Sequence, residues 1–127
     1  MKKKQSVAIW KEMLELAHSI QCNDKQIKNY IEVSTEYGYC LYSIYALGWE
    51  ILWYGFTGDQ QGTYDTDQMK KAIKAYDAMW ERYQSLHEYN PQCGTLYRPY
   101  SFVNEGPDYH GEDGMDKWIN HYRQKVL

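Results

Sequence analysis

The chain has little of what assigns a protein to a membrane, an export route or a disulfide scaffold. No stretch of its 127 residues approaches the roughly 18 apolar residues of a membrane span. The basic start at Lys2–Lys4 is not followed by an apolar core, so no signal peptide is predicted. Three cysteines without close spacing argue against a disulfide framework, although a Cys22–Cys93 bridge stays open. These absences leave the compartment of the protein undetermined.

Positive charge is missing from the middle of the sequence. No lysine or arginine occurs between Tyr30 and Met69, and the formal net charge of the whole chain is −3. A protein that holds nucleic acid needs a basic stripe to neutralise the phosphates, and this sequence has none. We therefore expect neither nucleic acid nor a membrane as a partner.

Aromatic residues, in contrast, are abundant. They make up 17% of the chain, with fourteen tyrosines, five tryptophans and two phenylalanines. Tyrosine suits half-buried positions, because its ring packs while its hydroxyl reaches water or a polar partner. A chain of this length can bury a sizeable core, so we expect residues 1–127 to form one domain.

Apolar periodicity predicts an all-α fold, an antiparallel bundle of three long helices plus a short C-terminal helix, with a long aromatic-rich loop before it. The expected helices cover residues 5–21, 24–54 and 66–88, and the last begins at residue 113. Two buried stripes are expected, the first on the 5–21 helix and the second on the 66–88 helix. The first stripe consists of Ile9, Met13, Leu16, Ala17 and Ile20. The second consists of Met69, Ile73, Tyr76, Met79, Trp80, Tyr83 and Leu86.

The helix expected at 24–54 carries a seven-residue apolar repeat, typical of the seam of a bundle. Gly38 and Gly48 lie on this seam, which predicts close approach of a neighbouring helix or aromatic ring; a kink is the alternative. Cys40 lies on a flank of this helix and is expected to be a small buried hydrophobe. The seam residues are Ile27, Ile31, Ser34, Gly38, Leu41, Tyr45, Gly48 and Leu52.

Turn and cap signals mark the ends of the expected helices. Asn23, with Gln26 three residues later, predicts an N-cap for the second helix, and Asp65 predicts one for the third. The segment 55–66 holds three glycines and no apolar period, so it is predicted to be a loop.

Candidate metal ligands are present without a metal-binding pattern. An acidic segment at 104–116 contains oxygen ligands of the kind that calcium uses, but not the spacing of a calcium-binding loop, so a cation there stays open. Asp59, Asp65 and Asp67 are a weaker version of the same idea. The cysteines and histidines lack a close ligand pair for zinc. The sequence therefore predicts no metal site and no cofactor.

Catalytic patterns are equally sparse. No nucleophile elbow occurs, and nothing in the sequence pairs two carboxylates as a glycosidase requires. Glu50 lies between Trp49 and Trp53 on the long helix, where we expect a partly exposed carboxylate bonded to a tyrosine. A small enzyme that uses Glu50 with His110 or His121 is a further, weaker alternative.

Several aromatics next to polar side chains are of the type on which a sugar ring stacks. They are the aromatics expected in or beside the loops, with Asp59, Gln60, Gln61 and Asn104 as polar neighbours: Tyr54, Phe56, Tyr64, Tyr97, Tyr100, Phe102 and Tyr109. The competing interpretation is that these rings belong to the core, as most aromatic residues do. The residues that we expect at a ligand-binding or interdomain surface are Trp53, Tyr54, Phe56, Tyr97, Tyr100 and Phe102.

Three segments carry a resemblance to a known family. They are STEYGYCLYSIYALGWEILWYGFTGD at 34–59, AIKAYDAMWERYQSLHEYNPQCGTLYRPYSF at 72–102 and GMDKWINHYR at 114–123. The tryptophan pair ahead of GFTGD and the run YDAMWERYQSL are its main elements. The pattern resembles the C-terminal helical region that follows the catalytic barrel in bacterial α-glucuronidase-like glycoside hydrolases.

The resemblance implies a non-catalytic accessory domain, a fragment of a larger multidomain enzyme. Its partners would be the catalytic domain of that enzyme and an oligo- or polysaccharide. No catalytic residue carries over, because no position matches a catalytic motif. The alternative is a free-standing helical protein that self-associates, for example as a homodimer, through its aromatic faces.

Overall fold

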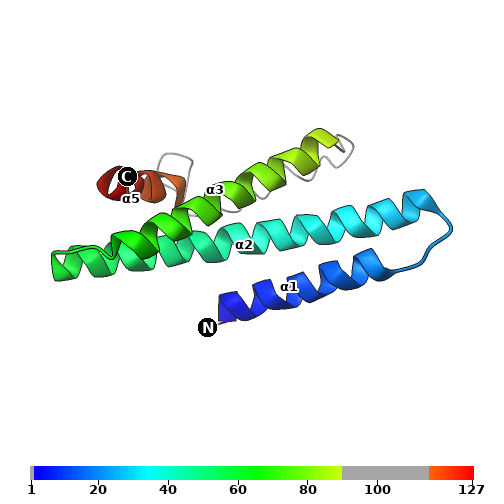
Figure 1. Cartoon of the computed structure of the whole chain (residues 1–127), viewed down its shortest axis with the longest axis horizontal. Coiled ribbons are helices and arrows are strands. Elements are labelled where there is room, and N and C mark those ends of the chain that lie inside the picture. The colour runs from blue at the N-terminus through cyan, green and yellow to red at the C-terminus, as the bar shows by residue number, and fades with distance from the viewer. Residues whose placement is uncertain (1, 90–114) are drawn as a thin grey trace.

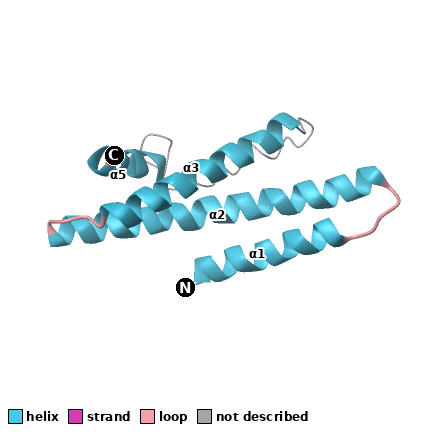
Figure 2. Ribbon diagram, viewed as in Figure 1, coloured by secondary structure: helices cyan, strands magenta, loops and turns pink. Residues whose placement is uncertain are grey.

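The computed structural model describes residues 2–89 and 115–127, and within these ranges it forms four helices and no strand. Figures 1 and 2 show an all-α bundle of three long helices and one short one, which confirms the predicted fold class. The predicted aromatic-rich loop lies in 90–114, outside the described residues. The helices are α1 (Lys2–Ser19), α2 (Lys25–Gln61), α3 (Thr66–Tyr89) and α5 (Met115–Val126).

Helix α2 is the common support of the bundle. It runs the length of the molecule with α1 and α3 on its two sides, and it contacts each of the other helices (Figure 1). The side chain of Met115 on α5 lies against Gly48 of α2. Tyr122 follows Met115 by seven residues, and it lies against Gly55, which follows Gly48 by seven residues. The short helix α5 therefore lies along the C-terminal half of α2 and runs in the same direction.

The main core lies between α2, α3 and α5. The apolar face predicted for α3 is confirmed, because Met69, Ile73, Tyr76 and Tyr83 are buried and its other members pack against them. From α2 the core takes Cys40, Ile44 and Ile51, which are spaced by four and seven positions as one helix face requires, together with the adjacent Leu52. The remaining buried members of the core are Ala72, Met115, Ile119, Tyr122 and Val126.

The predicted end of α2 is wrong, because the helix continues through the glycine-rich segment to Gln61. Glycine costs a helix up to about 1 kcal/mol relative to alanine. In this segment Gly55 receives the ring of Tyr122 and Gly58 receives the ring of Tyr64. Packing of two aromatic rings against the helix backbone therefore offsets the poor local propensity. The helix ends where Gly62 adopts a left-handed conformation, with φ of 77°.

The prediction that this stripe of α1 is buried is also wrong, except at Ala17. Ile9, Met13, Leu16 and Ile20 expose 58%, 43%, 65% and 41% of their surface. The helix instead packs on α2 through a neighbouring face that holds Leu14 and Ala17, both buried, together with the half-buried Val7 and Trp10.

Gly38 explains how α1 approaches α2 so closely. A Cβ atom at this position would lie closer than 3.0 Å to the six-membered ring of Trp10, so the glycine makes room for the indole. Trp10 also stacks on Tyr42, with ring centroids 5.5 Å apart. Close approach is confirmed at both seam glycines, since Gly48 receives the Met115 side chain in the same way.

The helix caps differ in one respect from the prediction. Asp24, not Asn23, caps α2: its carboxylate accepts hydrogen bonds from the backbone N–H groups of Gln26 (2.9 Å) and Ile27 (3.3 Å). The cap predicted for α3 is confirmed, because the Asp65 carboxylate accepts a hydrogen bond from the backbone N–H of Gln68 at 3.3 Å.

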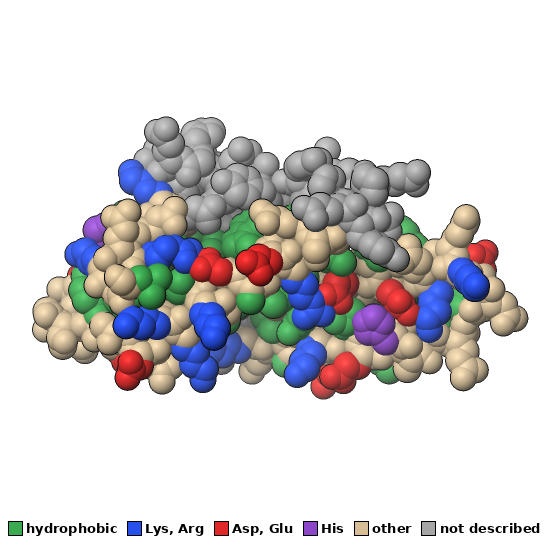
Figure 3. Space-filling view, turned by 45° about the horizontal axis from the view of Figure 1, so that its top comes forward, with side chains coloured by type: hydrophobic (Ala, Val, Ile, Leu, Met, Phe, Trp, Pro, Cys, Tyr) green, Lys and Arg blue, Asp and Glu red, His purple; other side chains and the backbone are tan. Residues whose placement is uncertain are grey.

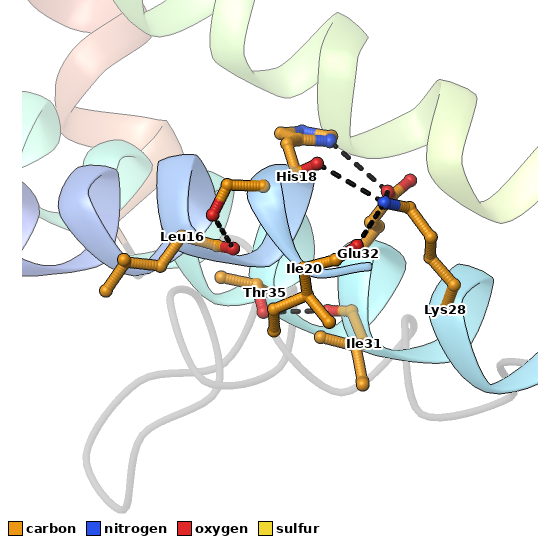
Figure 4. Close-up of polar contacts among 8 residues, drawn as sticks. Leu16, His18, Ile20, Lys28, Ile31, Glu32 and Thr35 are labelled. Atoms are coloured by element: carbon orange, nitrogen blue, oxygen red, sulfur yellow. Dashed lines mark hydrogen bonds and ion pairs between the residues drawn. The ribbon is translucent and has the colours of Figure 1, made fainter. Parts of the chain in front are cut away.

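Polar contacts join the C-terminal end of α1 to the start of α2 (Figure 4). The Lys28 ammonium group donates hydrogen bonds to the carbonyls of Ile20 (2.5 Å) and His18 (3.3 Å), which satisfies carbonyls at the end of α1. Glu32 lies 3.5 Å from the Lys28 ammonium and 3.6 Å from His18 Nδ1. A cation at this end also complements the helix dipole of α1.

Ion pairs also join the other helices. Arg123 of α5 holds Asp77 of α3 through two hydrogen bonds, one of 2.8 Å, and Arg82 of α3 bonds to Glu36 of α2. Figure 3 shows a face that carries side chains of both signs, with hydrophobic side chains between them. Among the described residues, no helix combines the length and the apolar character needed to cross a membrane.

Cys40 is a fully buried member of the core, as predicted. Burial raises the pKa of its thiol to about 12, so the reactive thiolate is scarce at neutral pH. Cys22 is half-buried, and Cys93 lies outside the described residues. The Cys22–Cys93 bridge therefore stays an open alternative.

Candidate functional site

A cluster of exposed aromatic rings lies on the C-terminal half of α2 and on α5. Trp49, Trp53 and Phe56 are spaced by four and three residues, which places them on one stripe of the helix. They expose 39%, 67% and 43% of their surface. Trp118 of α5 is 42% exposed and meets Phe56 edge to face, with ring centroids 5.8 Å apart. We call these four residues the aromatic patch.

The structure brings together two of the six residues predicted for a binding surface. Trp53 and Phe56 both belong to the aromatic patch. Tyr54 points away from it, because a one-step displacement on a helix turns a side chain by about 100°. Its ring is half-buried and packs against the core. Tyr97, Tyr100 and Phe102 lie outside the described residues.

Sequence reasoning missed Trp49 and Trp118 as members of the patch. The signal for Trp49 was its spacing from Trp53 and Phe56, which continues one stripe. No such signal exists for Trp118, because its place depends on how α5 packs against α2. That packing follows from Gly48 and Gly55, which accept Met115 and Tyr122 against the α2 backbone.

A hydrogen-bonded network lies beside the patch and fixes α5 to the end of α2. The Asp59 carboxylate accepts a bond from the hydroxyl of Tyr122 at 2.6 Å and another from the hydroxyl of Tyr64. Lys125 donates to the Tyr64 oxygen at 3.1 Å, and its ammonium lies 3.9 Å from Asp59. The network joins α2, the turn before α3, and α5.

The network shifts the protonation of its members. The bond from Tyr122, followed by the bond from Tyr64, lowers the pKa of Asp59 below its ordinary value. Burial and the bond to Asp59 raise the pKa of Tyr122, and the bond to Tyr64 raises that of Lys125. At neutral pH the network therefore holds an ionised Asp59, a neutral Tyr122 and a charged Lys125.

A pH dependence of stability follows from Asp59. Because its folded-state pKa lies below the ordinary 3.8, its contribution is complete above that value and is lost as the pH falls through the folded-state pKa. We expect the fall in melting temperature between about pH 4 and pH 2 to be smaller in an Asp59→Asn variant. Melts followed by circular dichroism test this, with Glu12→Gln as the control on an exposed carboxylate. Identical acid profiles for Asp59→Asn and the parent chain would contradict the expectation.

Only some of the polar residues expected beside a sugar site are available to a ligand among the described residues. Gln60 and Gln61 are exposed at the end of α2. Asp59 is committed to Tyr64 and Tyr122, so its oxygens serve the fold. Asn104 lies outside the described residues.

The alternative catalytic residues have other partners. Glu50 lies 3.9 Å from the Lys4 ammonium, at the edge of a hollow of about 400 Å³ between α1, α2 and α3. The hollow is mostly apolar. The expected tyrosine partner of Glu50 is thus replaced by a lysine. His121 packs edge-on against the Tyr122 ring at 5.0 Å, and His110 lies outside the described residues.

The second group of acidic residues considered for a cation has structural roles. Asp59 accepts tyrosine hydroxyl groups, Asp65 caps α3, and Asp67 lies in the first turn of that helix. The segment 104–114 is outside the described residues, and in the remainder no group of histidine, cysteine and acidic side chains is arranged to hold a metal ion.

The aromatic patch is therefore the feature of the described surface that most resembles a binding site. It joins two helices, and the glycine contacts and the Asp59 network hold those helices in place. Comparison with known proteins found no match to this chain among family models, curated proteins or solved structures.

Proposed function

We propose that this chain is a non-catalytic helical module of a carbohydrate-active enzyme and that the aromatic patch binds an oligosaccharide. The observation that carries the proposal is the exposure of Trp53, two-thirds of whose surface faces solvent on the same helix stripe as Trp49 and Phe56. The face of an indole ring is electron-rich. It can therefore pack against the C–H groups on the flat face of a pyranose.

The size and composition of the patch support a binding role. Single exposed hydrophobic residues are normal on protein surfaces, whereas adjoining large ones mark contact sites. Tryptophan is also among the residue types that are enriched where binding energy is concentrated in interfaces. The rigid seating of α5 presents the rings in a fixed arrangement, which lowers the entropy lost when a ligand binds.

Titration with a panel of plant-polysaccharide oligosaccharides, read by tryptophan fluorescence, tests the proposal. We expect saturable quenching in the parent chain and its loss in a Trp53→Ala variant. Tyr30→Ala is the matched control, because Tyr30 is 70% exposed on the same helix but lies near the opposite end. A flat titration across the panel would reject sugar binding and favour a contact between this patch and another domain.

A further inference from the structure

The exposed stripe of α1 has the spacing of a coiled-coil seam. Ile9, Met13, Leu16 and Ile20 follow one another at intervals of four, three and four residues. This is the seven-residue pattern with which two helices pack side by side. Ile27 at the start of α2 is 51% exposed and lies just beyond the turn that follows Ile20. We call these five residues the α1 seam.

The α1 seam is separate from the contacts that hold α1 in the bundle. Helix α1 packs on α2 through Leu14 and Ala17, which are buried. In Figure 4, Leu16 and Ile20 point to one side of the helix pair, while His18 points to the other. Polar contacts thus occupy one flank of α1, whereas the α1 seam on the other flank faces solvent.

We propose that a second copy of this chain covers the α1 seam and that two α1 helices pack antiparallel about a two-fold axis. This proposal is independent of sugar binding at the aromatic patch. A two-fold interface requires a surface that matches itself. The four-three-four spacing reads the same in both directions, so antiparallel pairing sets Ile9 against Ile20 of the other copy and Met13 against Leu16.

The size of the surface favours a second copy. The five side chains of the α1 seam expose between 41% and 65% of their surface. Covering them on both copies would bury on the order of 1,000 Å², which is where specific protein interfaces begin. This area counts the five side chains alone, and the residues that flank them would add to it.

The helix dipoles favour the antiparallel direction, and the charges on α1 do not oppose it. The pairing brings Glu12 of one copy opposite Ser19 of the other, so the acidic side chain meets a hydroxyl rather than a like charge. Antiparallel packing also sets the positive end of one helix dipole beside the negative end of the other.

Sedimentation equilibrium of the full chain is the first test. We expect a reversible dimer, and a Leu16→Glu variant that dissociates roughly 100-fold more readily, since the dimer would lose two buried leucine contacts. Ala8→Glu is the control, because Ala8 is exposed on α1 but off the α1 seam. Circular dichroism checks that the variants remain folded. A parent chain that stays monomeric at all concentrations overturns the proposal, as does a dimer that Leu16→Glu leaves intact.

Mixing charged variants tests the direction of the pairing. In the antiparallel dimer, Met13→Lys and Leu16→Glu chains place a lysine beside a glutamate, so their mixture should associate more tightly than either chain alone. In a parallel dimer, the favourable mixture would be Met13→Lys with Met13→Glu. Recovery by the second mixture and not by the first would overturn the antiparallel arrangement.

Discussion

A Tyr122→Ala variant is expected to lose about 3–5 kcal/mol of unfolding free energy, the cost of removing a large buried aromatic side chain. Tyr122 is fully buried where α5 meets α2, with Phe56 and Tyr64 edge to face around it. Its removal would leave a cavity beside Gly55, which has no side chain to fill the space. Urea denaturation followed by circular dichroism measures the loss.

A Tyr122→Phe variant separates the ring from its hydroxyl. It keeps the packing but loses the 2.6 Å bond to Asp59, so we expect a clearly smaller loss than for Tyr122→Ala, because the exposed Asp59 carboxylate can bond to water instead. If Tyr122→Ala and Tyr122→Phe cost the same, the ring would contribute little and our account of the α2–α5 contact would be incorrect.

The second large effect is expected at Gly55, where alanine should destabilise the fold by about 1–3 kcal/mol through overpacking. A Cβ atom there would lie closer than 3.0 Å to the ring of Tyr122. That ring is held by its bond to Asp59 and cannot turn aside without breaking it. Alanine has the higher helix propensity, by up to about 1 kcal/mol, so a net loss would show that packing dominates.

Gly48→Ala is the matched control for Gly55→Ala. It makes the same substitution on the same helix, facing the same partner helix. At Gly48, however, the neighbour is the sulfur end of Met115, a flexible side chain that can move. We expect Gly48→Ala to be close to neutral in denaturant titrations. Equal losses at Gly48 and Gly55 would show that the rigidity of the neighbour does not matter.

Helix α3 shows what periodicity alone can predict. Its bounds and its cap at Asp65 were predicted to within a residue, and its buried face correctly. These features are local, because they depend on the spacing of apolar residues and on one N-terminal carboxylate. The end of α2 is not local, since the helix passes through Gly55 and Gly58 only because Tyr122 and Tyr64 pack there.

Helix α1 shows why a correct period can give the wrong face. Two adjacent stripes fit helical spacing equally well. One runs through Val7, Trp10, Leu14 and Ala17, and the other contains Ile9, Met13, Leu16 and Ile20. Which of them meets α2 depends on Gly38, whose missing side chain makes room for Trp10. A pattern read within one helix cannot contain that information.

The residues of the candidate site also fall into two groups, those that the local sequence predicts and those that only the packing of the helices brings together. Trp53 and Phe56 were predicted from residue type and from their place beside polar neighbours. Trp118 could not be, because its contact with Phe56 arises only when α5 packs on α2. The network at Asp59 joins residues 63 positions apart in the sequence and likewise had no local signal.

Among the residues that the structure describes, the main core takes members from α2, α3 and α5, and none from α1. Detaching α1 would therefore expose few of the contacts that hold the other three helices together. We therefore expect the amide protons of α1 to exchange with solvent through a partial opening that leaves the other three helices protected.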